Sequence, residues 1–279
     1  MQQVFDAHVD TLMRIGDPEQ FLKGTRRTHL DMPRAIEAGV SHLVTAVCSE
    51  AEKDPLKAFH NGYSNYLQLR HRSSITLHLM LEGCQQLCEL PEREEIIRDA
   101  AVASLTWNGR NSLGGGIGTD TGLTDPGRSL ALELHDEGVL LDVSHLCDRS
   151  RGELLSLGIC TVATHCNCRA LHDFPRNLPD DDLRRIAASG GVVGITFVPA
   201  FLGGGEALED IVRHLEHLVD AAGIDAAGFG SDFDGVGRLP GGVPDCTVWP
   251  SLFELLDRRG WSAEDIDLVA FGNWRRVIK

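Results

Sequence analysis

The chain of 279 residues has no run of about 18 apolar residues, the length that a helix needs to cross a bilayer. It also lacks the apolar stretch of a signal peptide, because Asp6 and Asp10 stand where that stretch would begin. We therefore expect a protein that is neither exported nor embedded in a membrane and that works in the cytoplasm.

Positive charge is scarce in this sequence. Lys and Arg together number 26 against 41 Asp and Glu residues, which gives a formal net charge of −15. Such a surface repels the phosphates of nucleic acids and anionic lipid headgroups. We therefore expect neither nucleic acid nor a membrane as a partner.

Signatures of disulfide-rich, redox-active and phosphate-binding proteins are missing as well. The eight cysteines contain no C-x-x-C pair, and we predict reduced thiols that are mostly buried. The glycine-rich stretches 114–118 and 203–205 lack the Lys-Ser/Thr of a phosphate-binding loop, and we interpret both as mobile loops.

The sequence does contain a series of apolar runs rich in β-branched residues. They show no polar alternation, which is typical of parallel strands that are covered on both faces. Helical patterns lie between them; one begins at Thr124-Asp125-Pro126, and another keeps helical spacing from Ile211 to Ala222. The eight candidate strands are residues 4–8, 43–48, 75–81, 101–107, 139–143, 161–164, 192–198 and 226–230.

Eight strands that alternate with helices over about 250 residues match the size and rhythm of a (β/α)8 barrel. An open doubly wound sheet usually has fewer strands and a phosphate-binding loop, so it fits less well. We therefore predict a single (β/α)8 TIM-barrel domain over residues 1–279, of the metal-dependent hydrolase type.

Function in such a barrel resides where the strands end. The polar residues that close these apolar runs are all types that bind hard or borderline metal ions through nitrogen or oxygen. One strand-end histidine alone is weak evidence in a chain with 12 histidines, but six such residues together suffice for two metal ions. They are His8, Asp10, Glu82, His145, His165 and Asp232.

Glu82 is the only carboxylate at the third strand end, and we predict that it bridges two ions. His8 and Asp10 are two residues apart on one strand, so they would face the first ion together. His145 and His165 would then bind the second ion.

Two cations bridged by a carboxylate share a water molecule, lower its pKa and polarise a bound carbonyl. Asp232 would take the proton from this water, so we predict catalytic roles for Asp232 and for the bridging Glu82. The pattern indicates hydrolysis of an amide, an ester or a cyclic amide.

Two further residues each have two interpretations. Asp6 could orient His8 as a supporting carboxylate, or it could belong to a turn or to the barrel floor. Arg176 stands between two prolines in F-P-R-N-L-P-D and could receive a substrate carboxylate. A surface salt bridge explains the position of Arg176 equally well.

Two cysteines and two further histidines are not assigned to the site. Cys166 and Cys168 could be zinc thiolates or a nucleophile, but that would leave the strand-end carboxylates unexplained, so we favour incidental loop thiols. His214 and His217 share a helix face, and we predict a solvated surface pair.

The residues in this order resemble the renal (membrane) dipeptidase family of binuclear zinc peptidases, peptidase family M19. The likeness spans almost the whole chain, and chance does not explain so many motifs in the right order. The motifs are D-A-H-V-D at 6–10, L-E-G at 81–83, S-L-T-W-N at 104–108, G-L-T-D-P-G-R at 122–128, L-D-V-S-H at 141–145, T-H-C-N-C-R-A-L at 164–171, H-D-F-P-R-N-L-P-D-D at 172–181, G-S-D-F-D-G at 230–235 and F-G-N-W-R-R-V at 271–277.

The resemblance implies the barrel, two zinc ions or other divalent metals, and the ligand set given above with Glu82 as the bridge. It implies that Asp232 is the active-site aspartate near the first ion. It also implies that Arg176 grips the C-terminal carboxylate of a dipeptide, where family members often accept a D-residue. A homodimer is a further implication.

One position departs from the family pattern. Renal-type enzymes carry a histidine at the end of the fourth strand that helps to hold the scissile carbonyl, whereas this chain has Trp107. An indole has one N–H and cannot titrate. We interpret Trp107 as the mark of a subgroup with another substrate preference, in which Trp107 and Asn108 line the substrate pocket.

We therefore predict a zinc-dependent dipeptidase. An N-acyl-amino-acid hydrolase, or another amide or lactam hydrolase, could use the same two-metal site, and a requirement for a free substrate amino terminus would separate the two. A catalytically silent metal-binding barrel, with Trp107 filling the substrate space, is a third hypothesis. The intact ligand set argues against it.

Overall fold

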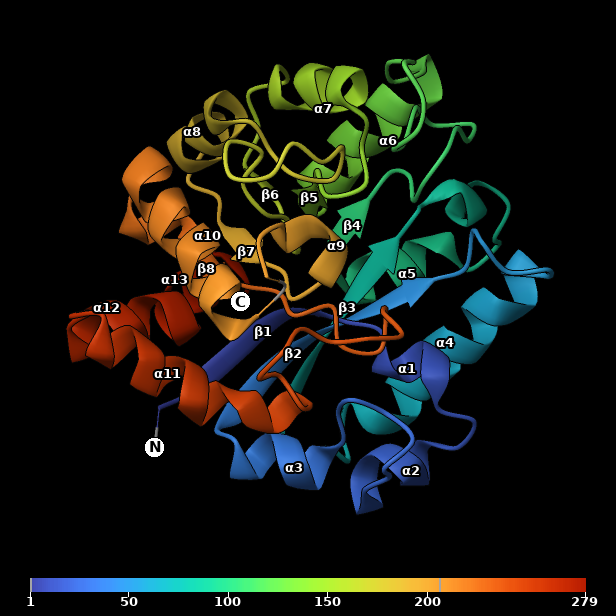
Figure 1. Ribbon diagram of the computed structural model, residues 1–279. Coiled ribbons are helices and arrows are strands. Elements are labelled where there is room, and N and C mark those ends of the chain that lie inside the picture. Colours follow the sequence, from blue (N-terminus) through green and yellow to red (C-terminus); the bar gives the residue numbers. More distant parts are fainter. Residues whose placement is uncertain (1, 206) are drawn as a thin grey trace.

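The computed structural model describes residues 2–205 and 207–279. Eight parallel strands form one sheet in the order β6-β5-β4-β3-β2-β1-β8-β7, and helices surround it (Figure 1). A parallel bridge between Ala163 and Val193 joins the two edge strands, so the sheet closes into the predicted (β/α)8 barrel. The strands are β1 (Val4–Val9), β2 (Val40–Cys48), β3 (Thr76–Glu82), β4 (Ala100–Ser104), β5 (Leu140–Asp142), β6 (Thr161–Val162), β7 (Val193–Ile195) and β8 (Ala227–Phe229).

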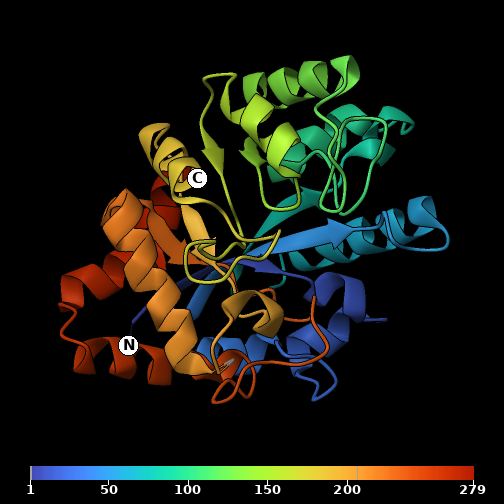
Figure 2. The same cartoon turned by 45° about the horizontal axis from the view of Figure 1, so that its top comes forward.

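Each predicted run overlaps one of these strands, although β4 to β8 end earlier than their runs. The helices form the outer ring of the barrel (Figure 2). None of the helices in the described ranges has the length and apolar character of a bilayer-crossing segment. The helices are α1 (Thr11–Arg14), α2 (Pro18–Lys23), α3 (Met32–Glu37), α4 (Pro55–Leu69), α5 (Arg93–Asp99), α6 (Asp125–Asp136), α7 (Asp148–Leu155), α8 (Asp180–Ala188), α9 (Pro199–Leu202), α10 (Leu208–Ala222), α11 (Trp249–Arg258), α12 (Ala263–Asp267) and α13 (Asn273–Val277), with short turns η1 (Gln85–Cys88), η2 (Ile224–Ala226), η3 (Cys246–Val248) and η4 (Leu268–Gly272).

Several helices begin with a capping residue and a proline in the first turn. The side chain of Asp54 accepts a hydrogen bond from the Lys57 N–H at the start of α4. Thr124 does the same for the Gly127 N–H at the start of α6, as its sequence predicts. These bonds satisfy amide groups that have no partner inside the helix, and proline supplies the required φ.

The apolar core has two parts. The larger part lies between the strands and the helices and includes the buried stripe of α10. The smaller part fills the amino-terminal half of the barrel, where Phe5, Val44 and Met80 meet Trp274 and Ile278 from the C-terminal segment. Because this end of the barrel is filled with apolar side chains, the open face is at the carboxyl ends of the strands.

The histidine pair on α10 differs from its prediction. His214 is fully buried, and it accepts a hydrogen bond from the Cys168 N–H (3.1 Å) and donates one to the Leu202 carbonyl (2.8 Å). Burial lowers the pKa of His214 to about 4, so the ring is neutral and uses one nitrogen as donor and the other as acceptor. The predicted surface pair is therefore wrong: only His217, which bonds Asp180, is partly exposed.

His214→Leu should lower the free energy of unfolding by about 2–4 kcal/mol, because it leaves a buried N–H and a buried carbonyl without partners. His217→Gln on the same helix is the matched control and should change stability by less than about 0.5 kcal/mol. Urea unfolding followed by circular dichroism measures both. Equal stability of the two variants would contradict the structural role of His214.

Candidate active site

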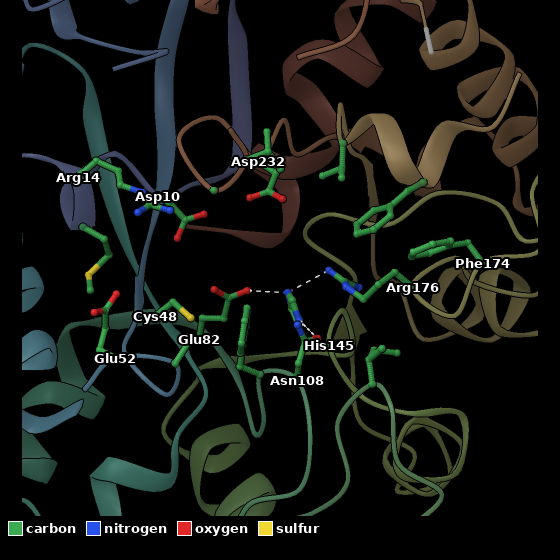
Figure 3. Close-up of a pocket in the computed structure, with 18 residues that line it drawn as sticks. Asp10, Arg14, Cys48, Glu52, Glu82, Asn108, His145, Phe174, Arg176 and Asp232 are labelled. Atoms are coloured by element: carbon green, nitrogen blue, oxygen red, sulfur yellow. Dashed lines mark hydrogen bonds and ion pairs between the residues drawn. The ribbon is translucent and has the colours of Figure 1, made fainter. Parts of the chain in front are cut away.

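The six strand-end residues predicted from the sequence converge at the carboxyl-terminal face of the barrel. Figure 3 labels Asp10, Glu82, His145 and Asp232 among them. His8 is the penultimate residue of β1, and Glu82 is the last residue of β3. The other four follow strands directly or within a few residues. They are Asp10 after β1, His145 after β5, His165 after β6 and Asp232 after β8.

His8 lies at the centre of one group of acidic side chains. Its Nε2 atom is 3.4 Å from Asp10 Oδ2, 3.8 Å from Glu82 Oε1 and 3.9 Å from Asp232 Oδ1. One ligand atom of His8, one of Asp10 and one of Asp232 lie within 4.8 Å of one another. These three side chains can therefore share one cation.

Glu82 lies between the histidines. Its Oε1 atom is 3.0 Å from His145 Nε2, 3.6 Å from His165 Nε2 and 3.8 Å from His8 Nε2. The side chain of Glu82 is buried and faces both the first and the later strand ends. This central position is the one that a bridging carboxylate requires.

Burial and neighbouring charges shift the pKa values of the cluster. Burial lowers the pKa of His8, but the surrounding carboxylates, Glu82 foremost, raise it to about 10. Burial raises the pKa of Glu82, yet His145 and His8 lower it to about 2. Burial and the adjacent Asp10 raise the pKa of Asp232 well above its usual range. The cluster therefore favours added positive charge, which a divalent cation supplies.

The imidazole nitrogens also fit a cation. His145 Nδ1 is 3.0 Å from the side-chain oxygen of Asn108, which only accepts, so the proton is on Nδ1 and Nε2 carries a lone pair. This Nε2 lies 2.9 Å from Nε2 of His165 and 3.0 Å from Glu82 Oε1. His8 Nε2 is buried and has no hydrogen-bond partner among the described residues. Converging lone pairs of this kind match the donor set of a metal site.

Asp232 reaches the site from a turn with left-handed backbone, at φ 64°. Its N–H donates to the His8 carbonyl (3.0 Å), and the Asp10 N–H donates to the Phe233 carbonyl (2.9 Å). A Cβ atom at Gly235 would collide with the carboxylates of Asp232 and Asp10. The unusual backbone and the glycine thus place two carboxylates side by side at the seam between β1 and β8.

The cluster forms the floor and one wall of a cavity of about 480 Å³. This volume suits a small molecule. The cavity is lined by Asp10, Met13, Arg14, Cys48, Ala51, Glu52, Glu82, Trp107, Asn108, Ile117, His145, Phe174, Arg176, Val198, Phe201, Asp232, Gly235 and Val236.

Arg176 faces this cavity on the side away from Asp10 (Figure 3). It is buried, and no carboxylate within the described ranges forms an ion pair with it. Its guanidinium lies over the Phe201 ring (5.3 Å) and contacts Cys166 Sγ (3.5 Å) and His145 Nε2 (3.0 Å). A surface salt bridge does not explain Arg176, whereas a carboxylate entering the cavity would give its fork an anionic partner.

Trp107 and Asn108 lie beside the cluster of six strand-end residues, in the loop that follows β4. The Trp107 ring stacks on the His145 ring with centroids 5.8 Å apart. The backbone is held tightly, because the Trp107 N–H donates to Glu50 Oε2 (3.0 Å) and a Cβ at Gly116 would collide with the Trp107 carbonyl. Residues 114–116 are buried and bridged to neighbouring segments, so they pack as part of the site rather than as a loose loop.

Two aspartates next to the site bond groups outside the cavity. The Asp6 carboxylate accepts from the N–H (2.8 Å) and hydroxyl (2.6 Å) of Ser231, so it ties β1 to the end of β8 and does not bond the His8 ring. Asp234 accepts from the Thr11 hydroxyl and the His29 N–H, both at 2.6 Å. Both aspartates therefore support the shape of the site from outside the cavity.

The cysteines after His165 are structural. Cys166 and Cys168 are buried and unpaired, and burial raises the pKa of both thiols. A buried thiol with a raised pKa is a poor nucleophile and a poor metal ligand. This agrees with the interpretation of incidental loop thiols.

No pattern in the sequence singles out one group of cavity residues. Arg14 and Glu52 line the end of the cavity opposite Arg176 (Figure 3), and Met13 also lines the cavity. Arg14 stands four residues after Asp10, and Glu52 stands four residues after the end of β2, so their closeness to strand ends was the only available signal.

The barrel and its cluster of three histidines and three carboxylates define a metal-dependent hydrolase. The chain belongs to the membrane dipeptidase family, peptidase family M19, whose family model matches residues 65–279. This confirms the family resemblance seen in the motifs.

Among its relatives, an uncharacterised dipeptidase of Schizosaccharomyces pombe is 30% identical over 219 residues. That match covers 75% of this chain and 54% of the relative, so the chain spans about half the length of the yeast protein.

Solved structures show the same fold. Dipeptidase AC, a metallopeptidase of family M19, superimposes with a TM-score of 0.92 at 25% identity, covering 99% of this chain and 97% of that one. A metallopeptidase from Rhodobacter sphaeroides, liganded with a phosphinate mimic of the dipeptide L-Ala-D-Ala, gives a TM-score of 0.91 at 24% identity, with 99% and 98% coverage.

Proposed function

We propose that this chain is a zinc-dependent dipeptidase that folds as a single domain and cleaves the peptide bond of short peptides. The observation that carries the proposal is the pairing, in one cavity, of a metal-type cluster with the buried Arg176, which has no carboxylate partner among the described residues. A dipeptide carries its scissile carbonyl one residue away from its carboxylate. In this cavity the cluster of metal-binding residues can serve the carbonyl, and Arg176 can bind the carboxylate.

His8, Asp10 and Glu82 would hold one ion, and Glu82, His145 and His165 the other. Two divalent cations in such a site lower the pKa of a shared water and polarise the substrate carbonyl. Nitrogen and oxygen donors of this composition suit zinc, although other divalent metals accept them as well.

The chain's own residues then orient the substrate and move the proton. Arg176 binds the C-terminal carboxylate with its guanidinium fork, which sets the distance from the carboxylate to the scissile carbonyl. Asp232 accepts the proton of the attacking water and delivers it to the leaving amine. Trp107 and Asn108 close the side of the cavity next to His145.

The charge of the cavity favours a dipeptide over an N-acyl-amino acid. Glu52 and Arg14 line the end of the cavity away from Arg176 (Figure 3), and the Glu52 carboxylate, which is not a proposed metal ligand, complements a free ammonium group. The mimic bound by the Rhodobacter sphaeroides enzyme has a D-residue at its C-terminal position, and this supports testing D-residues there.

The test is hydrolysis of L-L, L-D and N-acetylated dipeptides by zinc-reconstituted protein, with a chelated sample as control. We expect zinc-dependent cleavage and a loss of about 10-fold or more in kcat/KM on N-acetylation, because the ammonium group loses its carboxylate partner. Cleavage of the N-acetylated compounds alone would instead indicate a deacylase. No cleavage at full metal loading would overturn both.

A further inference from the structure

A single buried hydroxyl lies beneath two of the proposed metal ligands. Thr164 Oγ1 is 2.8 Å from His165 Nδ1 and 3.3 Å from His8 Nδ1. The same oxygen is 2.7 Å from Asp142 Oδ2. All four residues are buried, with exposed fractions of 1% or less, so water does not compete for these bonds.

The direction of each hydrogen bond follows from Asp142. Its Oδ1 atom accepts from the Ser144 N–H (2.9 Å), the Ser144 hydroxyl (2.7 Å) and the Thr164 N–H (3.0 Å). With several donors directed at it, Asp142 acts as a carboxylate that only accepts. The Thr164 hydroxyl must therefore donate its one proton to Asp142.

The Thr164 hydroxyl can still accept two hydrogen bonds, one from each histidine. A hydroxyl has one proton and two lone pairs. Because the proton of Thr164 is used by Asp142, both lone pairs are free to accept, one from the Nδ1–H of His8 and one from the Nδ1–H of His165. Each imidazole then presents an unprotonated Nε2 toward Glu82.

We propose that Asp142 and Thr164 form a positioning pair that sets the tautomer and ring orientation of one histidine ligand from each of the two metal positions. His8 belongs to one position and His165 to the other, so one hydroxyl supports both and couples their affinities. This inference rests on the proposed metal site, and it assigns function to two residues outside the cavity.

The test is a zinc titration of the metal-free chain against a competing chromophoric chelator at fixed pH. Thr164→Val keeps the shape of the side chain but cannot accept, and we expect it to weaken both zinc sites by about 10–100-fold, the range seen when supporting partners of metal ligands are lost. Thr164→Ser keeps the hydroxyl and should bind both ions nearly as the parent chain does.

A matched control separates positioning from folding. Thr196 is a buried threonine after β7 whose hydroxyl bonds the Ser231 carbonyl (3.4 Å) and no proposed ligand. Thr196→Val should leave zinc affinity unchanged. Histidine ¹⁵N NMR of the metal-free parent should show His165 protonated at Nδ1, and Thr164→Val should populate the other tautomer of this ring.

The outcomes are distinct. Parent-like zinc binding by Thr164→Val would overturn the proposal, and weakening of one zinc site alone would overturn the shared role of the hydroxyl. Equal weakening by the valine and serine variants would show that Thr164 acts through packing. If Thr164→Val weakens both zinc sites, Thr164→Ser and Thr196→Val bind zinc as the parent does, and the protein cleaves no dipeptide, the positioning pair is supported and the proposed activity is refuted.

Discussion

Glu82→Ala should remove metal binding and hydrolysis together. The Oε1 atom of Glu82 lies 3.0–3.8 Å from the Nε2 atoms of three histidines, and no other carboxylate stands at the end of β3 to replace it. Losing the metal forfeits several kcal/mol of transition-state stabilisation, so we expect kcat to fall by about 1000-fold or more.

Metal content after dialysis and dipeptide turnover measure this result on the same sample. Glu82→Gln tests the carboxylate at nearly constant volume and should behave like the alanine variant. Glu94→Gln on the exposed face of α5 is the control and should match the parent chain. Two bound ions in Glu82→Ala would refute the bridging role.

Arg176→Ala should keep both metals and bind dipeptides poorly. Removing one partner of a buried charge pair costs about 2–5 kcal/mol, so we expect kcat/KM to fall by 100-fold or more. Because the carboxylate is held in both the ground state and the transition state, most of the loss should appear in KM.

Initial rates over a range of dipeptide concentrations separate KM from kcat. Arg176→Lys keeps the charge but loses the planar fork, so it should recover only part of the affinity. Arg184→Gln, on the exposed side of α8, is the control for removal of an arginine. Parent-like kinetics of Arg176→Ala would show that the substrate lies in another orientation.

The fold was largely predictable because parallel strands buried on both faces leave a strong signal. Each of the eight apolar runs overlaps a strand, and the strand-end positions of His8 and Glu82 followed directly from them. The ends of the runs were less predictable. Leu105 and Thr106 continue the apolar run of β4 but lie beyond the strand, and this places Trp107 in a loop.

Side-chain partners could not be predicted in the same way. Apolar periodicity reports which face of a helix is buried, but not that His214 on that face finds a donor at Cys168, after β6, and an acceptor at Leu202, at the end of α9. Asp142 likewise acquires its proposed function only through Thr164, which lies 22 residues later and two residues beyond β6. Such pairs depend on how distant segments of the chain are aligned in the folded barrel, and local sequence patterns do not encode this alignment.

The seam between β1 and β8 has a consequence for how the protein is made. The Asp10 N–H bonds the Phe233 carbonyl and the Asp232 N–H bonds the His8 carbonyl, so the first and last residues of the proposed site meet only when the barrel closes. On the ribosome, more than 220 residues separate the emergence of His8 from that of Asp232. Because such long-range pairing forms late, we expect the side of the site that holds His8 and Asp10 to take its final shape only after Asp232 has emerged. We therefore expect metal loading of this side to follow closure of the barrel.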